Sequence, residues 1–406
     1  MRPLCRNSAS LLVLVLVGAC AGNPGRPAAP ASSAAPARAA APGLATEKAI
    51  DVDPLRIKVV EDAAAGKPEV EVYDARDLFD QAGAALDGES WDQALELYDR
   101  IVTEFPSSAL VVPALFNAGL AHEGKADAEG AIARYQHVIR IAGRPRDSID
   151  ASMRIAAVLA EQGAWARSAA ALDPVLASKA ATPDDRLEAL ARRGYALVEQ
   201  KSYADAEKAL AAAVALTGKG DRSDYFAAMA HFYQAEIPRR QAAAVPLRLP
   251  DAQLRADLDA KAKLVLLAQA RYEATVGLGN VLWATAAGHQ LAVMQEDMWR
   301  ALVGAPVPGQ LKKEEAAIYV AEVRKVARPY LDRALDIHSK NVALAERYRT
   351  ESPWSEGSRQ RIPLLADLIA RENRGERPGP GDGLAGPATA VTAGDPDRYV
   401  PARVDL

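Results

Sequence analysis

The residues that could carry out chemistry are few and scattered along this 406-residue chain. No two of its five histidines are spaced to lie on one helix face beside a carboxylate, as a helical metal site requires. Acid pairs such as Asp184-Asp185 and Glu314-Glu315 fit the first turn of a helix, where the helix dipole favours negative charge. The sequence therefore predicts no active site, no metal and no cofactor. We interpret the histidines as surface or packing residues: His122, His137, His231, His289 and His338.

Three tryptophans, Trp283, Trp299 and Trp354, could stack on sugar rings. They lie in segments with helical periodicity, where a buried indole contributes a large apolar area to the core. We interpret them as core residues, and a glycan-binding or cell-wall-enzyme regulatory module remains the alternative. The "GLGN" stretch at 277–280 is interpreted as a helix break, because no strand precedes it as in a phosphate-binding loop.

Both cysteines, Cys5 and Cys20, lie near the start of the chain. Residues 1–19 have the layout of an export signal, with arginines first, an apolar run at 11–17 and small residues at 18–19. That run is shorter than the roughly 20 residues that a membrane-spanning helix needs. Once the signal is removed, Cys20 is the one remaining thiol, so no internal disulfide can form.

The four residues Val17-Gly18-Ala19-Cys20 resemble the lipobox of bacterial lipoproteins. The resemblance implies that Cys20 becomes the new N-terminus and carries a diglyceride and palmitate-like acyl chains. Two or more such chains hold a protein stably, since each buried methylene contributes about 0.8 kcal/mol. By the sorting rules of that class, Ala21 in place of an aspartate implies an outer-membrane protein that faces the periplasm. The alternative is an ordinary secretory signal with a chance cysteine.

Composition divides the rest of the chain. Residues 20–52 are mostly Ala, Pro, Ser and Gly and cannot bury a core, so they are predicted to be a tether behind the lipidated cysteine. The Gly- and Pro-rich residues 373–406 are predicted to be a disordered tail. Between them the chain is rich in alanine, with 5% aromatic and 25% charged residues overall, which is typical of helices. A net charge of −4 without a basic stripe argues against nucleic-acid binding.

A repeat occupies residues 74–218. Aligned small residues at Ala94, Ala131, Ser168 and Ala206 are separated by 37, 37 and 38 residues. Each unit also has a small residue twelve positions earlier and a large one four positions later. Two helices that cross closely need small residues where their backbones meet and a bulky residue one turn on. The earlier set is Ala82, Gly119, Ala156 and Gly194, and the later set is Tyr98, Tyr135, Leu172 and Leu210.

These positions resemble the tetratricopeptide repeat, which the first unit matches at Ala82, Ala94, Tyr98 and Pro106. The sequence departs from that repeat in two ways. Its period is longer than the usual 34 residues, and only the first unit keeps the terminal proline. The sequence thus predicts an all-α fold, a tetratricopeptide-like helical-repeat solenoid followed by a bundle of longer helices. Residues 53–73, which alternate apolar and polar, are predicted to form either a short hairpin or an extended segment packed on the first repeat.

Additional long helices are predicted for 219–372. A Pro-rich link begins near Ile237 and precedes a helix over 251–276, and the next helix ends at "APVPG". The segment 312–349 predicts a long helix that Pro329 kinks or divides. Ser352 and Pro353 then provide a cap and a first-turn proline for the last helix.

This half, through "QAEIPRRQAAAVPLRLPDAQLRADLDAKAKLVLLAQARYEATV", "LWATAAGHQL" and "MWRALVGAPVPG", is similar to tetratricopeptide lipoproteins of the focal-adhesion gliding-motility machinery. The resemblance implies a non-enzymatic periplasmic scaffold for envelope proteins, with no small-molecule substrate. A rival resemblance, carried by "EFPSSA" at 104–109, is to the repeat lipoprotein of the outer-membrane β-barrel assembly machine. The rival leaves the long second half without a role.

In repeats of this type the first helix of each pair lines the concave face. Projection from the small residues by helical spacing predicts an apolar strip there, edged by acids. Such a strip suits an extended or helical partner with apolar anchors and basic flanks. Leu86 and Met153 are equally suited to packing between repeats. The predicted apolar lining is Phe79, Leu86, Phe116, Leu120, Met153 and Tyr195, and the acids are Asp87, Glu123, Asp150, Glu188 and Glu199.

Overall fold

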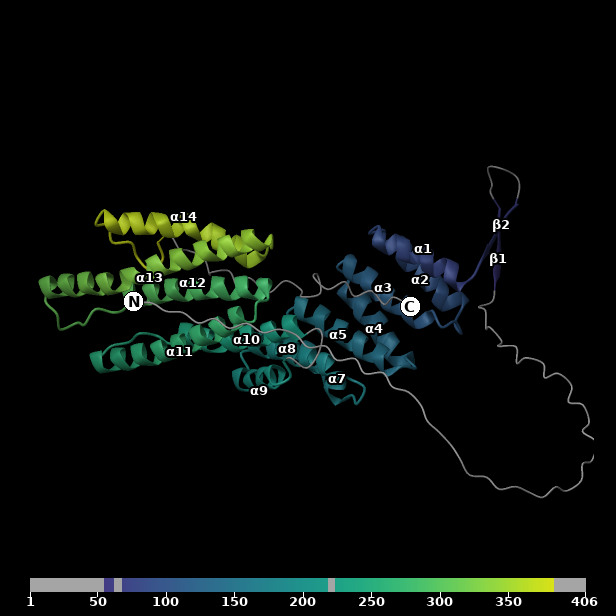
Figure 1. Cartoon of the computed structure of the whole chain (residues 1–406), viewed down its shortest axis with the longest axis horizontal. Helices are drawn as coiled ribbons and strands as arrows, with labels where there is room; N and C mark the ends of the chain where they lie inside the picture. The colour runs from purple at the N-terminus through teal and green to yellow at the C-terminus, as the bar shows by residue number, and fades with distance from the viewer. Residues whose placement is uncertain (1–54, 62–67, 218–222, 383–406) are drawn as a thin grey trace, which may run out of the picture. The chain divides into compact units, whose positions relative to one another are not determined.

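The computed structural model describes residues 55–61, 68–217 and 223–382 (Figure 1). The predicted signal, Cys20 and the tether lie outside these residues, as does the chain after 382. Contacts divide the chain into Met1–Val52 and Asp53–Leu406, and all the described residues belong to the second unit. Among them, no helix is long and apolar enough to cross a membrane.

A hairpin precedes the helices. Strands β1 (Arg56–Glu61) and β2 (Pro68–Tyr73) pair antiparallel, with Ile57 opposite Val72. Of the two structures left open by the sequence, the chain adopts the hairpin. The chain passes directly from Tyr73 into the first helix, whose N-cap Asp74 accepts a hydrogen bond from the backbone N–H of Asp77 in a capping box.

Four helix pairs come next, each helix packed on its pair partner and each second helix on the first helix of the next pair. Figure 1 shows the pairs in chain order from α1 to α9. This arrangement confirms the predicted tetratricopeptide-like array. The pairs are α1 (Ala75–Asp87) with α2 (Trp91–Glu104), α3 (Val111–Gly124) with α4 (Ala128–Ile141), α5 (Pro145–Glu161) with α6 (Trp165–Ala171), and α8 (Pro183–Glu199) with α9 (Tyr203–Val214).

The repeated small residues lie where the two helices of a pair meet. A Cβ added to Gly119 would be 2.5 Å from Cε1 of the Tyr135 ring, so the ring occupies the space that glycine leaves. Leu210 fills the equivalent space beside Gly194. Tyr98, Tyr135, Leu172 and Leu210 are all fully buried, as the pattern predicted.

The third pair departs from the others. Its second helix, α6, ends at Ala171, and a separate short helix, α7 (Asp173–Ala177), comes after it with Pro174 in its first turn. Proline lacks the N–H that would continue the helix and clashes with the preceding turn. Leu172 at the break is still buried, so the packing position survives although the helix does not.

Five long helices make up the second half: α10 (Ser223–Ala244), α11 (Asp251–Gly277), α12 (Val281–Val303), α13 (Lys313–Tyr348) and α14 (Pro353–Asn373). The prediction that a link begins near Ile237 is wrong, because α10 runs through Pro238. Burial of Ile237 and Ala242 stabilises the helix beyond the proline. Helix α13 is likewise undivided at Pro329, and Ser352 caps α14 as predicted.

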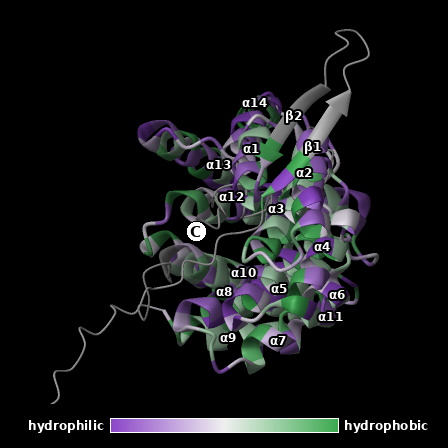
Figure 2. Ribbon diagram, turned by 90° about the vertical axis from the view of Figure 1, so that its right-hand side faces the viewer, coloured by the Kyte–Doolittle hydropathy of each residue, from purple (hydrophilic) through white to green (hydrophobic). Residues whose placement is uncertain are grey.

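One apolar cluster joins the last repeat to the long helices. It contains residues of α8, α9, α10, α11 and α12 together with Trp354 of α14. The rings of Phe232, Trp283 and Trp354 contact one another with centroids 5.2–6.2 Å apart. Trp283, Trp299 and Trp354 are all buried, which confirms the core interpretation. Hydrophobic and hydrophilic residues alternate around the helices, as Figure 2 shows.

The chain after α14 stays in contact with the helices for a further stretch. Arg324 donates a hydrogen bond to the backbone oxygen of Pro378 at 2.7 Å, and Pro378 is buried. The structure thus describes the first part of the predicted tail, residues 373–382, of which Pro378 is buried; the remainder lies outside the described residues.

Candidate functional site

The first helices of the four pairs contact one another in the order α1, α3, α5 and α8, and α8 in turn contacts the long helix α10. We call this set the first-helix row. Every predicted partner-binding residue lies on it, so the sequence placed them on the correct helices. Their exposure and contacts decide what the row can offer to a partner.

The apolar lining is less open than predicted. Phe116, Met153 and Tyr195 are only 5%, 7% and 8% exposed. The Phe116 ring lies edge-on to Tyr135, with centroids 5.2 Å apart, and Tyr195 packs between Trp165 and Tyr233. Contacts with neighbouring helices therefore cover the rings of Phe116 and Tyr195, and the burial of Met153 fits the packing between repeats that the sequence left open for it.

Three of the predicted apolar residues keep part of their surface. Phe79 is half-buried, with its ring edge-on to Tyr98 at a centroid distance of 5.7 Å. Leu86 and Leu120 are partly buried against the clusters of the first and second pairs. Of the predicted lining, exposed apolar surface thus remains only on α1 and α3; elsewhere in the row, Leu190 and Leu197 of α8 and Tyr225 of α10 are also only partly buried. Whether these residues bind a partner stays a prediction.

Most of the predicted acids have arginine partners. Glu123 of α3 forms an ion pair with Arg154 of α5 and accepts a hydrogen bond from the Tyr135 hydroxyl at 2.5 Å. Glu199 of α8 binds Arg240 of α10 through both carboxylate oxygens, at 2.5 and 3.0 Å. Glu123 and Glu199 thus link neighbouring helices of the row and already have basic partners within the chain.

The remaining three acids differ from one another. Glu188 pairs with Arg192 one turn further along α8, with 3.0 Å between Oε1 and Nε, and both side chains are nearly buried. Asp150 pairs with Arg146 within α5. Asp87, at the end of α1, is exposed to solvent.

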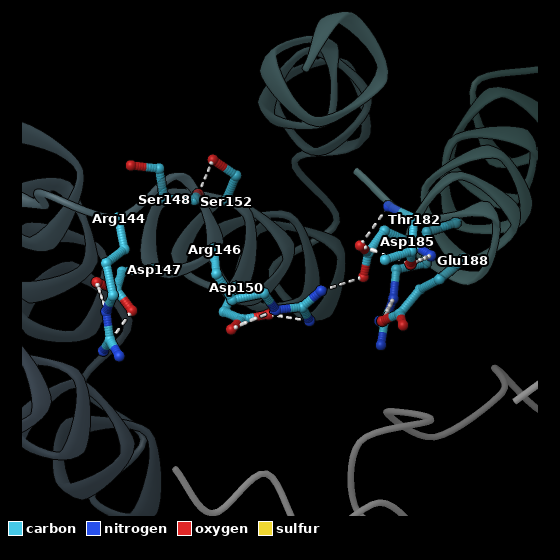
Figure 3. A network of polar contacts seen from close by, with 10 residues as sticks. Arg144, Arg146, Asp147, Ser148, Asp150, Ser152, Thr182, Asp185 and Glu188 are labelled. Atoms are coloured by element: carbon cyan, nitrogen blue, oxygen red, sulfur yellow. Dashed lines mark hydrogen bonds and ion pairs between the residues drawn. The ribbon is translucent and has the colours of Figure 1, made fainter. Parts of the chain in front are cut away.

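A polar network connects α5 to α8, and its residues appear in Figure 3. Arg146 bridges Asp150 on its own helix and Asp185 of α8, with 2.6 Å from the guanidinium to Asp185. Asp185 also closes a capping box with Thr182 at the start of α8. Burial alone would raise the pKa of Asp185, but hydrogen bonds from Thr182 and Arg146 outweigh it and lower that pKa. For Asp150 burial dominates and raises the pKa.

A second network surrounds Glu236 of α10, which is 2% exposed. Arg239 donates to both its oxygens at 2.7 and 2.8 Å, and Arg240 donates at 2.9 Å. The Tyr272 hydroxyl of α11 also donates to it. Burial would raise the pKa of Glu236, but these partners lower it to about 2. Through Arg240 and Glu199, this network continues the line of ion pairs that connects the first-helix row.

The arrangement most like a catalytic group is buried between α12, α13 and α14. Nδ1 of His338 lies 3.0 Å from the Ser358 hydroxyl, and its Nε2 lies 3.0 Å from Glu296. A serine, a histidine and an acid in this order could activate a nucleophile. Ser358, His338 and Glu296 are, however, completely buried.

The neighbours of this group satisfy its polar atoms. Ser358 also bonds His289 at 3.1 Å and accepts from Asn341 at 2.9 Å, while Arg361 donates to Glu296 at 2.5 Å. Burial lowers the pKa of His289 to about 3, so that ring is neutral. We interpret the group as a hydrogen-bonded polar core. Sequence reasoning missed it because its members come from three helices, and the only signal was polar residues on otherwise apolar faces.

Two surface cavities lie in the second half. One of about 290 Å³ is bordered by Val245, Lys261 and Arg300, and one of about 350 Å³ lies at the start of α14. Lys261 donates to the backbone oxygen of Ala242 at 2.5 Å, at the carbonyl end of α10. This contact suits a helix-capping role for the lysine. Within the described ranges no cluster of His, Cys, Asp or Glu has the geometry of a metal site.

Comparisons with known proteins give only distant similarity. No protein-family model and no curated protein sequence matches the chain. A tetratricopeptide repeat protein from Parabacteroides merdae is 13% identical, with a TM-score of 0.35 over 72% of this chain and 98% of that one. A TPR repeats protein from Bacteroides fragilis is 12% identical, with a TM-score of 0.26 over 74% of this chain and 99% of that one.

Proposed function

We propose that the chain is a non-enzymatic scaffold whose first-helix row binds other proteins of the cell envelope. The observation that carries the proposal is the row itself, a series of adjacent helices held by ion pairs from α3 to α10. A series of paired helices presents an extended surface, which is how repeat proteins bind their partners. The predicted lining residues that keep exposed apolar surface lie on α1 and α3, so binding is expected to centre there.

We further propose that the scaffold is tethered to the outer membrane through Cys20 and works in the periplasm. The support is the lipobox-like sequence before Cys20 and the Pro-rich stretch after it. The resemblance of the second half to focal-adhesion lipoproteins favours gliding motility as the process. A role in β-barrel assembly and a role in regulating cell-wall enzymes are the alternatives, and they differ in which partners they require.

Recovery of partners from gently solubilised envelopes tests this function. Phe79→Ala, Leu120→Ala and Asp87→Lys together alter the accessible part of the row. Ile139→Ala and Ile141→Ala on α4 are the matched control, because those residues are 38% and 42% exposed but lie on a second helix. We expect the first variant to lose its partners and the control to keep them. Equal recovery by both would place binding elsewhere.

The anchor has a separate test. Cys20→Ala is expected to move the protein from the outer-membrane fraction to the soluble periplasmic fraction, because the lipid would be its attachment. Fractionation in cells that lack the recovered partners removes attachment through those partners. A variant that still sediments with the outer membrane under these conditions would contradict the lipid anchor.

A further inference from the structure

The hairpin is held to the helices at its base. Tyr73 is buried, its hydroxyl donates to Glu104 at 2.6 Å, and its ring lies 6.2 Å from the Phe105 ring. Opposite Tyr73 in the register, Arg56 donates to the backbone oxygen of Glu104 at 2.6 Å. The base of the hairpin is therefore fixed on the end of α2.

Beyond its base the hairpin is an incomplete sheet. Ile57 and Val72 face each other across the strands and are 71% and 54% exposed, and Leu55 is 66% exposed. Strands β1 and β2 pair only with each other among the described strands, so each has one row of backbone donors and acceptors outside the ladder. Two-stranded sheets are marginal in water, and such an edge is a template for a further strand.

The register indicates which sequence fits beside β2. Within the hairpin, Ile57 pairs with Val72, Lys58 with Glu71 and Val59 with Val70. Over residues 56–59, the strand that already pairs with β2 alternates basic and apolar residues, which matches the acidic and apolar alternation of "PEVEVY". Nearer the turn, Val60 pairs with Glu69 and Glu61 with Pro68, so the match is confined to the half of the hairpin next to its base. Cross-strand pairs of apolar residues and of opposite charges stabilise a sheet. A strand on the other side of β2 would meet the same residues.

The surroundings of the two edges also differ. Strand β2 leads directly into the start of α1, where Asp74 is the N-cap and Asp77 lies in the first turn. Arg76 lies between them and forms an ion pair with Asp80, so the negative charges of Asp74 and Asp77 remain beyond this pair. Strand β1 carries Arg56 and Lys58 with Glu61 at its end, so its net charge is positive, whereas β2 carries Glu69 and Glu71 and no basic residue. Arg56 is already engaged with Glu104 and lies over the Phe105 ring. A basic segment is therefore attracted to the β2 edge and repelled from the β1 edge.

We propose that the outer edge of β2 binds an extended segment of a partner protein, which adds a third strand and alternates apolar with Lys or Arg residues. This inference rests on the proposed scaffold function but uses a surface separate from the first-helix row. A second copy of the chain fits less well, although residues 56–59 of its β1 have the required alternation. Pairing of β1 of one copy with β2 of the next leaves a new edge each time, so it builds open filaments from negatively charged chains.

The test uses the full chain and a blocked synthetic peptide, RVKVRVKV, with fluorescence anisotropy to measure binding. We expect saturable binding, at least tenfold weaker binding of EVDVEVDV, and slowed amide exchange within residues 69–73. A peptide of the same sequence with N-methyl groups on alternate amides along one side loses the hydrogen bonds of strand addition but keeps its charge. Two methylated peptides are compared, one for each side of the strand. If both bind as tightly as the unmethylated peptide, charge attraction alone explains the binding and the proposal is overturned.

Charge-reversal variants locate the site. Glu69→Lys with Glu71→Lys should exchange the preference, so that EVDVEVDV binds better than RVKVRVKV. Glu322→Lys with Asp367→Lys is the matched control, because it makes the same change in net charge on exposed helix positions. Equal loss in both variants, failure of the peptide to bind, or self-association of the chain through the hairpin would each refute the proposal. Variants of the first-helix row should leave peptide binding unchanged, which separates this test from that of the scaffold function.

Discussion

Gly119 offers a direct test of how the repeats pack. It lies in α3, where a methyl group in place of its hydrogen would meet the Tyr135 ring of α4 at 2.5, 2.6 and 3.0 Å. Ordinary contacts between carbon atoms are about 3.5–4.0 Å. Because Tyr135 is fully buried, its ring has little room to move away. Gly119→Ala therefore forces the two helices or the ring to shift.

Two opposing terms set the size of the effect. Overpacking a well-filled core costs about 1–3 kcal/mol. Alanine in place of glycine inside a helix stabilises by about 1 kcal/mol. Gly83→Ala in α1 measures the second term alone, because nothing lies within 4 Å of the position a Cβ would take there. The free energies of unfolding of the two variants should thus differ by about 1–3 kcal/mol, with Gly83→Ala the more stable.

Urea unfolding followed by circular dichroism gives this difference. A Tyr135→Ala background supplies the control, since removing the ring should make Gly119→Ala neutral or stabilising. If Gly119→Ala were as stable as Gly83→Ala in the unaltered background, the close approach of α3 and α4 would be refuted as the reason for glycine at this position.

Two further predictions use the polar core and the first-helix row. Burial lowers the pKa of His289 to about 3 in the folded chain, so the unfolded chain takes up the proton first. Above the unfolded pKa of about 6.5, the protonation of His289 does not change the free energy of unfolding. As the pH falls from there toward 3, that free energy decreases by up to about 1.4 kcal/mol per pH unit. His289→Asn should flatten this part of the stability curve in urea titrations at successive pH values, and an unchanged slope would contradict the assignment. Phe116→Ser should lower the free energy of unfolding by about 3–5 kcal/mol, because that ring is buried against Tyr135. Phe79→Ser should cost clearly less, since Phe79 is half-buried, and equal losses in denaturant midpoints would oppose this account.

The helices were predictable wherever local signals and burial agreed. Capping residues and breaks placed the starts of α12 and α14 within a residue or two, at Asn280 and Ser352. Pro238 misled because proline is a local signal, while the continuation of α10 is decided by burial of its last turns and by partners of Glu236. Tertiary packing overrode the local preference there. Pro174 had the opposite outcome and ended the second helix of the third pair.

The sequence could indicate which helices carry the predicted site residues, but not which side chains those residues contact. Helical spacing from the small residues placed the acids on the first helices, yet spacing along one helix carries no information about what the next helix presents. Arg154 lies 31 residues after Glu123, and Arg240 lies 41 residues after Glu199. An interval close to one repeat period is what brings side chains of adjacent first helices together. Pairs of opposite charge separated by about one repeat were therefore a usable signal for these bridges.

These ion pairs also limit what the acids of the first-helix row can offer to a partner. A carboxylate that meets an arginine of the next repeat contributes to stacking, and the same carboxylate is then less available to attract a basic partner. The hairpin differs, because it precedes the first repeat and its strand edges are not covered by a preceding pair. If charge guides partner recognition in this protein, the β2 edge with the acidic start of α1 is a better place for it than the paired acids of the row.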